Sequence, residues 1–137
     1  MIGANSNPWT RIAHSELRFL IGRTPPDGRV TLIDSQAPTN RRWAATRVWP
    51  ELSTQFDYAL VSRLRDRHTG SWVVTVAGLT PFGTRSAGEF LTDPVRLSHA
   101  LRVIPGGWQK RSLQLVLQTQ IEGSSSGPST VAAFDVR

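Results

Sequence analysis

The segment Gly78-Leu79-Thr80-Pro81-Phe82-Gly83-Thr84-Arg85-Ser86 combines residue types that bind an anion. It follows a nearly continuous β-branched run, 72–77, and leads into a helical pattern for which Thr84 is the expected N-cap. The first N–H groups of a helix lack partners within it and the helix dipole favours negative charge, so a phosphate or carboxylate fits there. The sequence therefore predicts a small-anion or nucleotide site; the plainer alternative is a turn followed by a capped helix. The predicted ligand contacts are Gly78, Gly83, Thr84, Arg85 and Ser86.

A second polar turn, Gly3-Ala4-Asn5-Ser6-Asn7-Pro8-Trp9, has the same character. Its candidate hydrogen-bonding residues are Asn5, Ser6 and Asn7, and Trp9 offers a stacking surface. Ligands of α/β sheets bind at the carboxyl ends of strands, so the two turns would face one pocket if they follow adjacent strands. The alternative is a capping turn with Trp9 in the core.

No catalytic constellation is indicated. Thr84-Arg85-Ser86-Ala87-Gly88 resembles the G-x-S-x-G nucleophile elbow, but threonine replaces the first glycine and the serine falls inside the predicted helix. The chain has no cysteine, no clustered carboxylates and only three separated histidines, so no metal site is indicated. We therefore expect a non-enzymatic ligand-binding or sensor domain without a cofactor. The histidines are His14, His68 and His99.

The chain is basic, with 16 lysines and arginines against 10 acidic residues and a formal net charge of +6. Such a charge permits a nucleic-acid partner, although the basic residues are dispersed and form no long run. Trp43, Trp49 and Trp108 stand beside basic residues and could stack on bases, whereas Trp72 is expected in the core. A nucleic-acid-binding module is thus the second hypothesis. The third is a protein-assembly domain that uses the strand 112–122 as a paired edge.

The hydrophobic periodicity predicts one α/β domain over 1–137, with a mixed sheet of about five or six strands, helices packed on it and a C-terminal β-hairpin. The run 72–77 is typical of a strand buried on both faces by helices, and 113–121 alternates as a strand with one wet face. The expected helices are 8–17, a short one at 40–48, one from Thr84, and one from Asp93-Pro94 to about Val103. The expected strands are 19–21, 29–34, 58–64, 72–77, 113–121 and 130–136. Of these, 58–64 and 72–77 are expected to form an antiparallel hairpin.

The chain resembles a family of bacterial α/β domains found in soil bacteria, for which no activity is established. The likeness lies in the turn Gly3–Trp9, in the long segment Asp57–Thr92 with its Ala-Gly-Leu-Thr-Pro-Phe-Gly-Thr-Arg-Ser-Ala-Gly-Glu-Phe-Leu-Thr stretch, and in Gly127-Pro128. The resemblance implies that the two glycine turns belong together. Family members carry a hydrophobic strand before the first turn, often at the end of longer proteins, and this chain lacks most of that strand. It is therefore expected to be truncated there or to be the C-terminal part of a longer protein.

The chain has neither a signal-peptide pattern at its start nor an apolar run of the roughly 18–20 residues that span a bilayer. We expect a cytoplasmic protein with no membrane partner.

Overall fold

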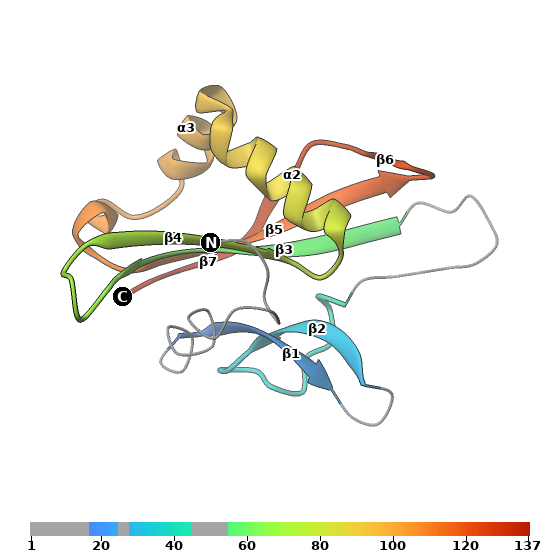
Figure 1. Ribbon diagram of the computed structural model, residues 1–137, viewed down its shortest axis with the longest axis horizontal. Coiled ribbons are helices and arrows are strands. Elements are labelled where there is room, and N and C mark those ends of the chain that lie inside the picture. Colours follow the sequence, from blue (N-terminus) through green and yellow to red (C-terminus); the bar gives the residue numbers. More distant parts are fainter. Residues whose placement is uncertain (1–16, 25–27, 45–54) are drawn as a thin grey trace.

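The computed structural model describes residues 17–24, 28–44 and 55–137 of the chain. Five strands form the main sheet, two helices cover one of its faces, and a separate two-stranded hairpin covers the other (Figure 1). The elements are β1 (Phe19–Thr24), β2 (Arg29–Asp34), β3 (Gln55–Arg65), β4 (Trp72–Gly78), α2 (Pro81–Thr92), α3 (Pro94–Arg102), the 3-10 turn η1 (Trp108–Lys110), β5 (Leu113–Glu122), β6 (Ser125–Ser126) and β7 (Thr130–Val136).

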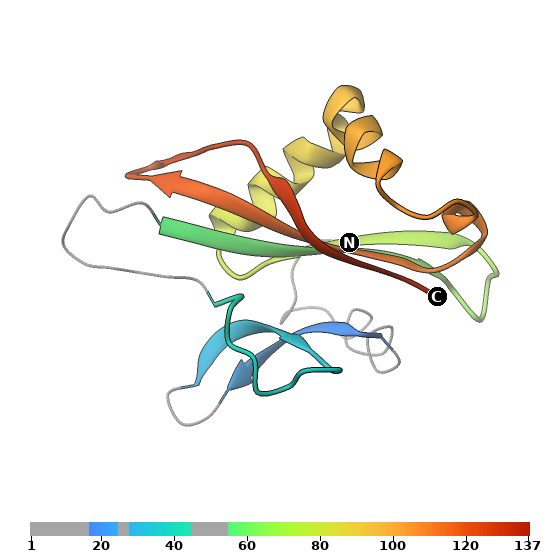
Figure 2. The same ribbon diagram turned by 180° about the vertical axis from the view of Figure 1, so that it is seen from behind.

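The main sheet has the order β4-β3-β5-β6, with β7 also pairing with β5 (Figure 2). All its strand pairs are antiparallel in the described part of the chain, so the expectation of a mixed sheet is wrong. The α/β prediction holds only coarsely, because strands predominate. The hairpin of β3 and β4 and the C-terminal hairpin of β5 and β7 are both confirmed. β5 lies between β3 and β7, so 112–122 is not an edge strand, and its predicted use as a paired edge in assembly is also wrong.

The helices begin at proline residues that follow capping side chains. Thr80 caps α2 and Asp93 caps α3, with Pro81 and Pro94 at the first helical positions, where a missing N–H costs nothing. The expected start of α3 and its end near Val103 are confirmed. Beneath the helices lies a hydrophobic core that combines α2 with alternate residues of the strands: Ala59, Val61, Val76, Ala87, Phe90, Ile104, Leu113, Leu115 and Leu117.

The other face of the sheet is covered by β1 and β2, not by helices. A second core of Phe19, Leu32, Trp43, Tyr58, Leu60 and Val116 lies between the hairpin and the sheet. The side-chain amide of Gln114 in β5 accepts from the Phe19 N–H and donates to the Phe19 carbonyl, each over 2.9 Å. β5 therefore has no wet face at this point, which corrects the alternation-based expectation.

A cationic side chain fastens this hairpin to the sheet. Arg18 donates to both carboxylate oxygens of Asp34 at 2.9 and 3.0 Å and approaches Asp135 of β7 at 3.7 Å. The guanidinium is the main reason that the pKa of Asp34 lies below its ordinary value; the Gln36 N–H adds to the effect, while burial opposes it. The contact thus favours the charged form of Asp34 over the neutral acid.

Several expectations concern residues outside the described part. These are the whole turn Gly3–Trp9 and the helix at 8–17 except for its last residue, Leu17. Of the suggested helix at 40–48, residues 40–44 are described and form a turn ending at Ala44, which bridges to Thr31. Among the described helices, none combines the length and apolar character needed to cross a membrane.

Candidate functional site

The first turn of α2, where the sequence predicts an anion, has internal partners for its backbone donors. Helix α2 begins at Pro81, three residues before the expected start, and Thr80 is the N-cap in place of Thr84. The Phe82 N–H donates to the Thr80 hydroxyl, and the Thr84 N–H donates to the Thr80 carbonyl. Pro81 has no N–H, which leaves the N–H of Gly83 as the remaining donor of this turn.

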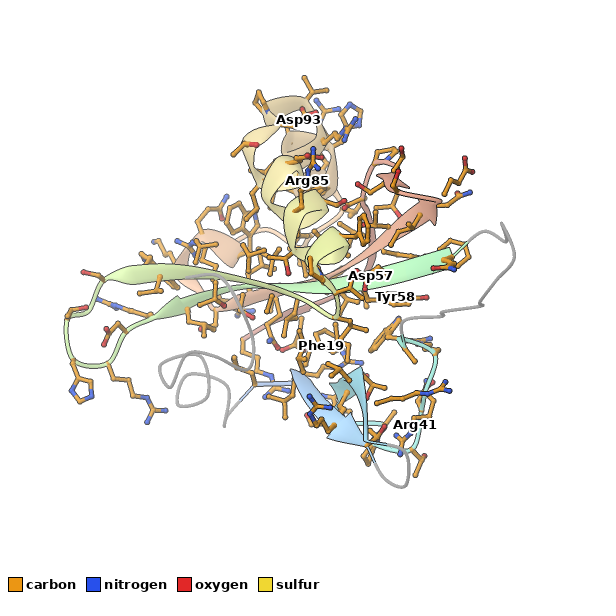
Figure 3. The ribbon with its side chains drawn as sticks, turned by 45° about the vertical axis from the view of Figure 1, so that its right-hand side comes forward. Phe19, Arg41, Asp57, Tyr58, Arg85 and Asp93 are labelled. Carbon is orange, nitrogen blue, oxygen red and sulfur yellow. The ribbon has the colours of Figure 1, made fainter. Side chains whose placement is uncertain are left out.

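That donor binds the side chain of Asp57, which belongs to β3. The Gly83 N–H lies 2.7 Å from Oδ2 of Asp57, and the Thr80 hydroxyl donates to the same oxygen. Oδ1 accepts from the Tyr58 N–H at 2.8 Å. Asp57 is only 1% exposed and lies directly under the first turn of α2 (Figure 3). A buried carboxylate needs such partners, and the helix dipole adds favourable potential. The negative charge that the sequence pattern calls for is therefore supplied by the chain itself.

The glycines of the loop permit this close approach. A Cβ on Gly83 would lie 2.6 Å from Oδ2 of Asp57 and 3.0 Å from the Tyr58 carbonyl oxygen. A Cβ on Gly78 would collide with the backbone nitrogen of Thr84. Both contacts are far inside normal packing distance, so the spacing of glycines follows from helix–strand packing.

The remaining predicted contacts of the loop do not converge on one point. The Thr84 hydroxyl accepts from the Gly78 N–H at 3.0 Å and donates to the Thr80 carbonyl. Arg85 is exposed and pairs with Glu89 one turn along the helix at 3.1 Å. Ser86 is 2% exposed on the buried side of α2, and its hydroxyl has no hydrogen-bond partner in the described structure.

The other predicted contacts are outside the described residues: Asn5, Ser6 and Asn7 all fall there, so a pocket shared by the two turns stays a prediction. Sequence reasoning missed Asp57 as the partner of this turn. The sequence does place a carboxylate next to the apolar run 58–61. A carboxylate buried in a strand needs hydrogen-bond donors, and these must come from another element, so this position could have indicated the contact.

A second candidate site, formed by basic and aromatic residues, lies at the opposite end of β3. The turn joining β3 to β4 and the segment containing η1 lie together at one end of the sheet in both Figure 1 and Figure 2. The pairing of Arg63 with Leu113 in the β3–β5 register fixes this proximity. We call the surface formed by Arg63, Arg65, Arg67, Lys110 and Arg111 the basic end.

Arg63 holds the two segments of the basic end together. Its guanidinium donates to the carbonyls of Gln109 and Arg111 at 3.0 and 3.2 Å. The same group lies 3.7 Å from the ring centroid of Trp72 and 5.5 Å from that of Trp108. Both distances are within the range of cation–π attraction. The result is a cation that contacts two indoles and is hydrogen-bonded to the segment that carries Lys110 and Arg111.

The tryptophans occupy different environments from those expected. Trp72, expected in the core, is 38% exposed, because β4 is an outer strand and the helices do not cover its first residues. Trp43, a candidate for stacking on bases, is 6% exposed and packs edge-on against Phe19. Trp108 is partly buried at the basic end, and Trp49 is not among the described residues. Among the described tryptophans, Trp72 and Trp108 thus combine a cation–π contact with partial exposure, whereas Trp43 contacts Arg42 but is buried.

The turn between β3 and β4 also carries a carboxylate, Asp66, which accepts hydrogen bonds from backbone groups of the same turn. Asp66 accepts from the backbone N–H groups of His68 and Thr69 at 2.7 and 3.3 Å. These bonds place the pKa of Asp66 below its ordinary value, the His68 N–H being the larger cause. Its sequence neighbours Arg65 and Arg67 are exposed cations.

In comparisons with known proteins, no family model, no curated protein and no solved structure matches the chain.

Proposed function

We propose that this domain is a non-enzymatic nucleic-acid-binding module that contacts phosphate groups through its basic end. The observation that carries the proposal is that hydrogen bonds from Arg63 join two distant segments, which together carry Arg63, Arg65, Arg67, Lys110 and Arg111, and that the same guanidinium lies against Trp72 and Trp108. Arginine and lysine neutralise phosphates, and aromatic rings beside them provide contacts to sugars and bases.

The basic end has an excess of positive charge of its own, in addition to the net charge of the whole chain. The two segments 63–72 and 105–112 carry these five basic residues against the single carboxylate of Asp66. Several basic side chains at one end of a sheet can approach several phosphates of one strand at once. Each contact releases counterions, so binding of this kind is strong at low salt and weak at high salt.

The small-anion site at the loop 78–86 has less support from the geometry. Its helix N–H donors already bind Asp57 and Thr80, and Arg85 pairs with Glu89. A small anion there would have to displace the Asp57 carboxylate. That hypothesis has a separate signature: stabilisation against heat by nucleotides or sugar phosphates, abolished by Arg85→Ala. A ligand at about 100 times its dissociation constant would add about 2.7 kcal/mol.

The proposal is tested with two matched double variants and a fluorescent oligonucleotide. Lys110→Gln with Arg111→Gln removes two cations from the basic end, and Arg96→Gln with Arg102→Gln removes two from α3. Each variant lowers the formal net charge from +6 by two. We expect the first to weaken binding by at least about tenfold and the second to change it little. Equal losses in the two variants would mean that net charge alone is responsible, and the basic end would lose its assigned role.

A further inference from the structure

We infer that the basic end takes single-stranded nucleic acid in preference to duplex, with a base stacked on the indole of Trp72. This inference rests on the proposed function. It adds which form of nucleic acid is bound, single strand or duplex, and which residue distinguishes the two.

The indole of Trp72 is available and held in place. The Arg63 guanidinium lies 3.7 Å from the ring centroid and is itself tied to the carbonyls of Gln109 and Arg111. The ring is therefore supported on one side by a group that is hydrogen-bonded to another segment. With 38% of the residue still exposed, part of the ring is open to a flat partner. A pre-oriented aromatic group gives up little conformational freedom when a base stacks on it.

The surroundings of Trp72 fit a phosphate backbone passing beside it. Arg65 pairs directly with Trp72 across the β3–β4 register and is exposed, and its Nε donates to the Gly70 carbonyl at 3.0 Å. Lys110 and Arg111 lie on the neighbouring segment, which the Arg63 hydrogen bonds fasten to β3. An indole flanked by cations from two segments is the arrangement that single strands require, with stacking for bases and cations for phosphates.

Duplex nucleic acid would use the cations but not the indole. Paired bases show only their edges in the grooves, and their faces are covered by stacking within the duplex. An unpaired base exposes its face and can be turned out onto an aromatic side chain. The surface indole thus distinguishes the two forms, whereas the charges alone do not.

The test compares oligothymidylate with a duplex of the same length, using the full chain. In Trp72→Leu an apolar side chain replaces the ring, and in Trp72→Phe an aromatic ring remains. Phe82→Leu is the matched control, because Phe82 is 37% exposed and lies on α2, outside the basic end. We expect Trp72→Leu to weaken single-strand binding by about 5- to 100-fold and Trp72→Phe to restore most of it. Duplex binding and the control variant should stay close to wild type.

Tryptophan emission provides a second measurement that does not depend on the folding of Trp72→Leu. Single strands should quench the emission of the wild type, and Trp72→Phe should lose most of that quenching. Single-strand binding that is no tighter than duplex binding, and unchanged in Trp72→Leu, would overturn the inference and leave the proposed function intact. Absence of binding to either form, or equal binding of polyglutamate, would overturn both.

Discussion

The carboxylate of Asp57 in β3 holds the first turn of α2 against the sheet. It is buried, and it accepts hydrogen bonds from Tyr58, Thr80 and Gly83. In Asp57→Asn an NH2 group would replace one carboxylate oxygen. That group donates hydrogen bonds, so it cannot accept them from the N–H or hydroxyl groups that surround it. We expect the free energy of unfolding to fall by about 2–4 kcal/mol. The measurement is the midpoint of urea unfolding at an unchanged slope.

The matched variant for this prediction is Arg85→Ala. Arg85 is exposed and only its surface pair with Glu89 would be lost, so a change below about 1 kcal/mol is expected. If Asp57→Asn unfolded at the same urea concentration as the wild type, the carboxylate would not be the anchor of the helix.

Two glycines of α2 should respond in opposite ways to alanine. At Gly83 a Cβ would press on Asp57, which costs about 1–3 kcal/mol or more when the packing cannot relax. At Gly88 a Cβ would meet nothing within 4 Å, and alanine is favoured over glycine in a helix by about 1 kcal/mol. Thermal unfolding should therefore give a lower midpoint for Gly83→Ala and a higher one for Gly88→Ala. A stable Gly83→Ala protein would show that β3 and α2 have room to separate.

At the scale of secondary-structure elements, local signals predicted most of what is present. The hairpin of β3 and β4 followed from two β-branched runs and a short turn, and α3 followed from Asp93-Pro94. Local sequence patterns could not predict the contacts between elements that are far apart in the chain. Gln114 looked like a wet-face residue because its partner, Phe19, lies in a hairpin almost a hundred positions away. The start of α2 was misplaced because the carboxylate that shapes it belongs to β3.

The ion pair that joins the two ends of the β1–β2 hairpin, Arg18 with Asp34, should weaken in acid. The pKa of Asp34 is lowered in the folded state, chiefly by its hydrogen bond from Arg18. Its stabilising effect is therefore full above the unfolded pKa of about 3.9 and is lost as pH falls through the lower folded value. We expect Asp34→Asn to be less stable than wild type by about 1–3 kcal/mol at neutral pH, with the deficit shrinking below about pH 4.

This pH dependence is measured by urea unfolding at several pH values. Glu122→Gln, which changes an exposed carboxylate at the end of β5, serves as the control and should show no comparable trend. A deficit in Asp34→Asn that is constant from neutral pH down to acid would mean that the ion pair between Arg18 and Asp34 does not stabilise the folded state.

For the molecule as a whole, the formal charge of +6 attracts any polyanion, and the distribution of that charge decides where it binds. The sequence showed the total but not the grouping, because the basic residues of 63–67 and 110–111 meet only through the β3–β5 register. Trp72 was misjudged for the same reason: its apolar strand is an outer one, and exposure depends on which elements cover it. The candidate interface therefore depends mainly on which residues the fold brings together, and this could not be predicted from the sequence.

The salt dependence of oligonucleotide binding measures how many of these cations meet phosphates. For a single strand, the logarithm of the binding constant falls against the logarithm of salt concentration with a slope of about −0.7 per phosphate neutralised. Replacing Lys110 and Arg111 by glutamine should reduce the steepness of that slope by about one to two, because two contacts disappear. The Arg96→Gln, Arg102→Gln variant has the same net charge and should keep the wild-type slope, since its cations lie on α3. Parallel slopes for all three proteins would place the phosphates away from the basic end, whereas a reduced slope in the first variant alone would locate them beside η1.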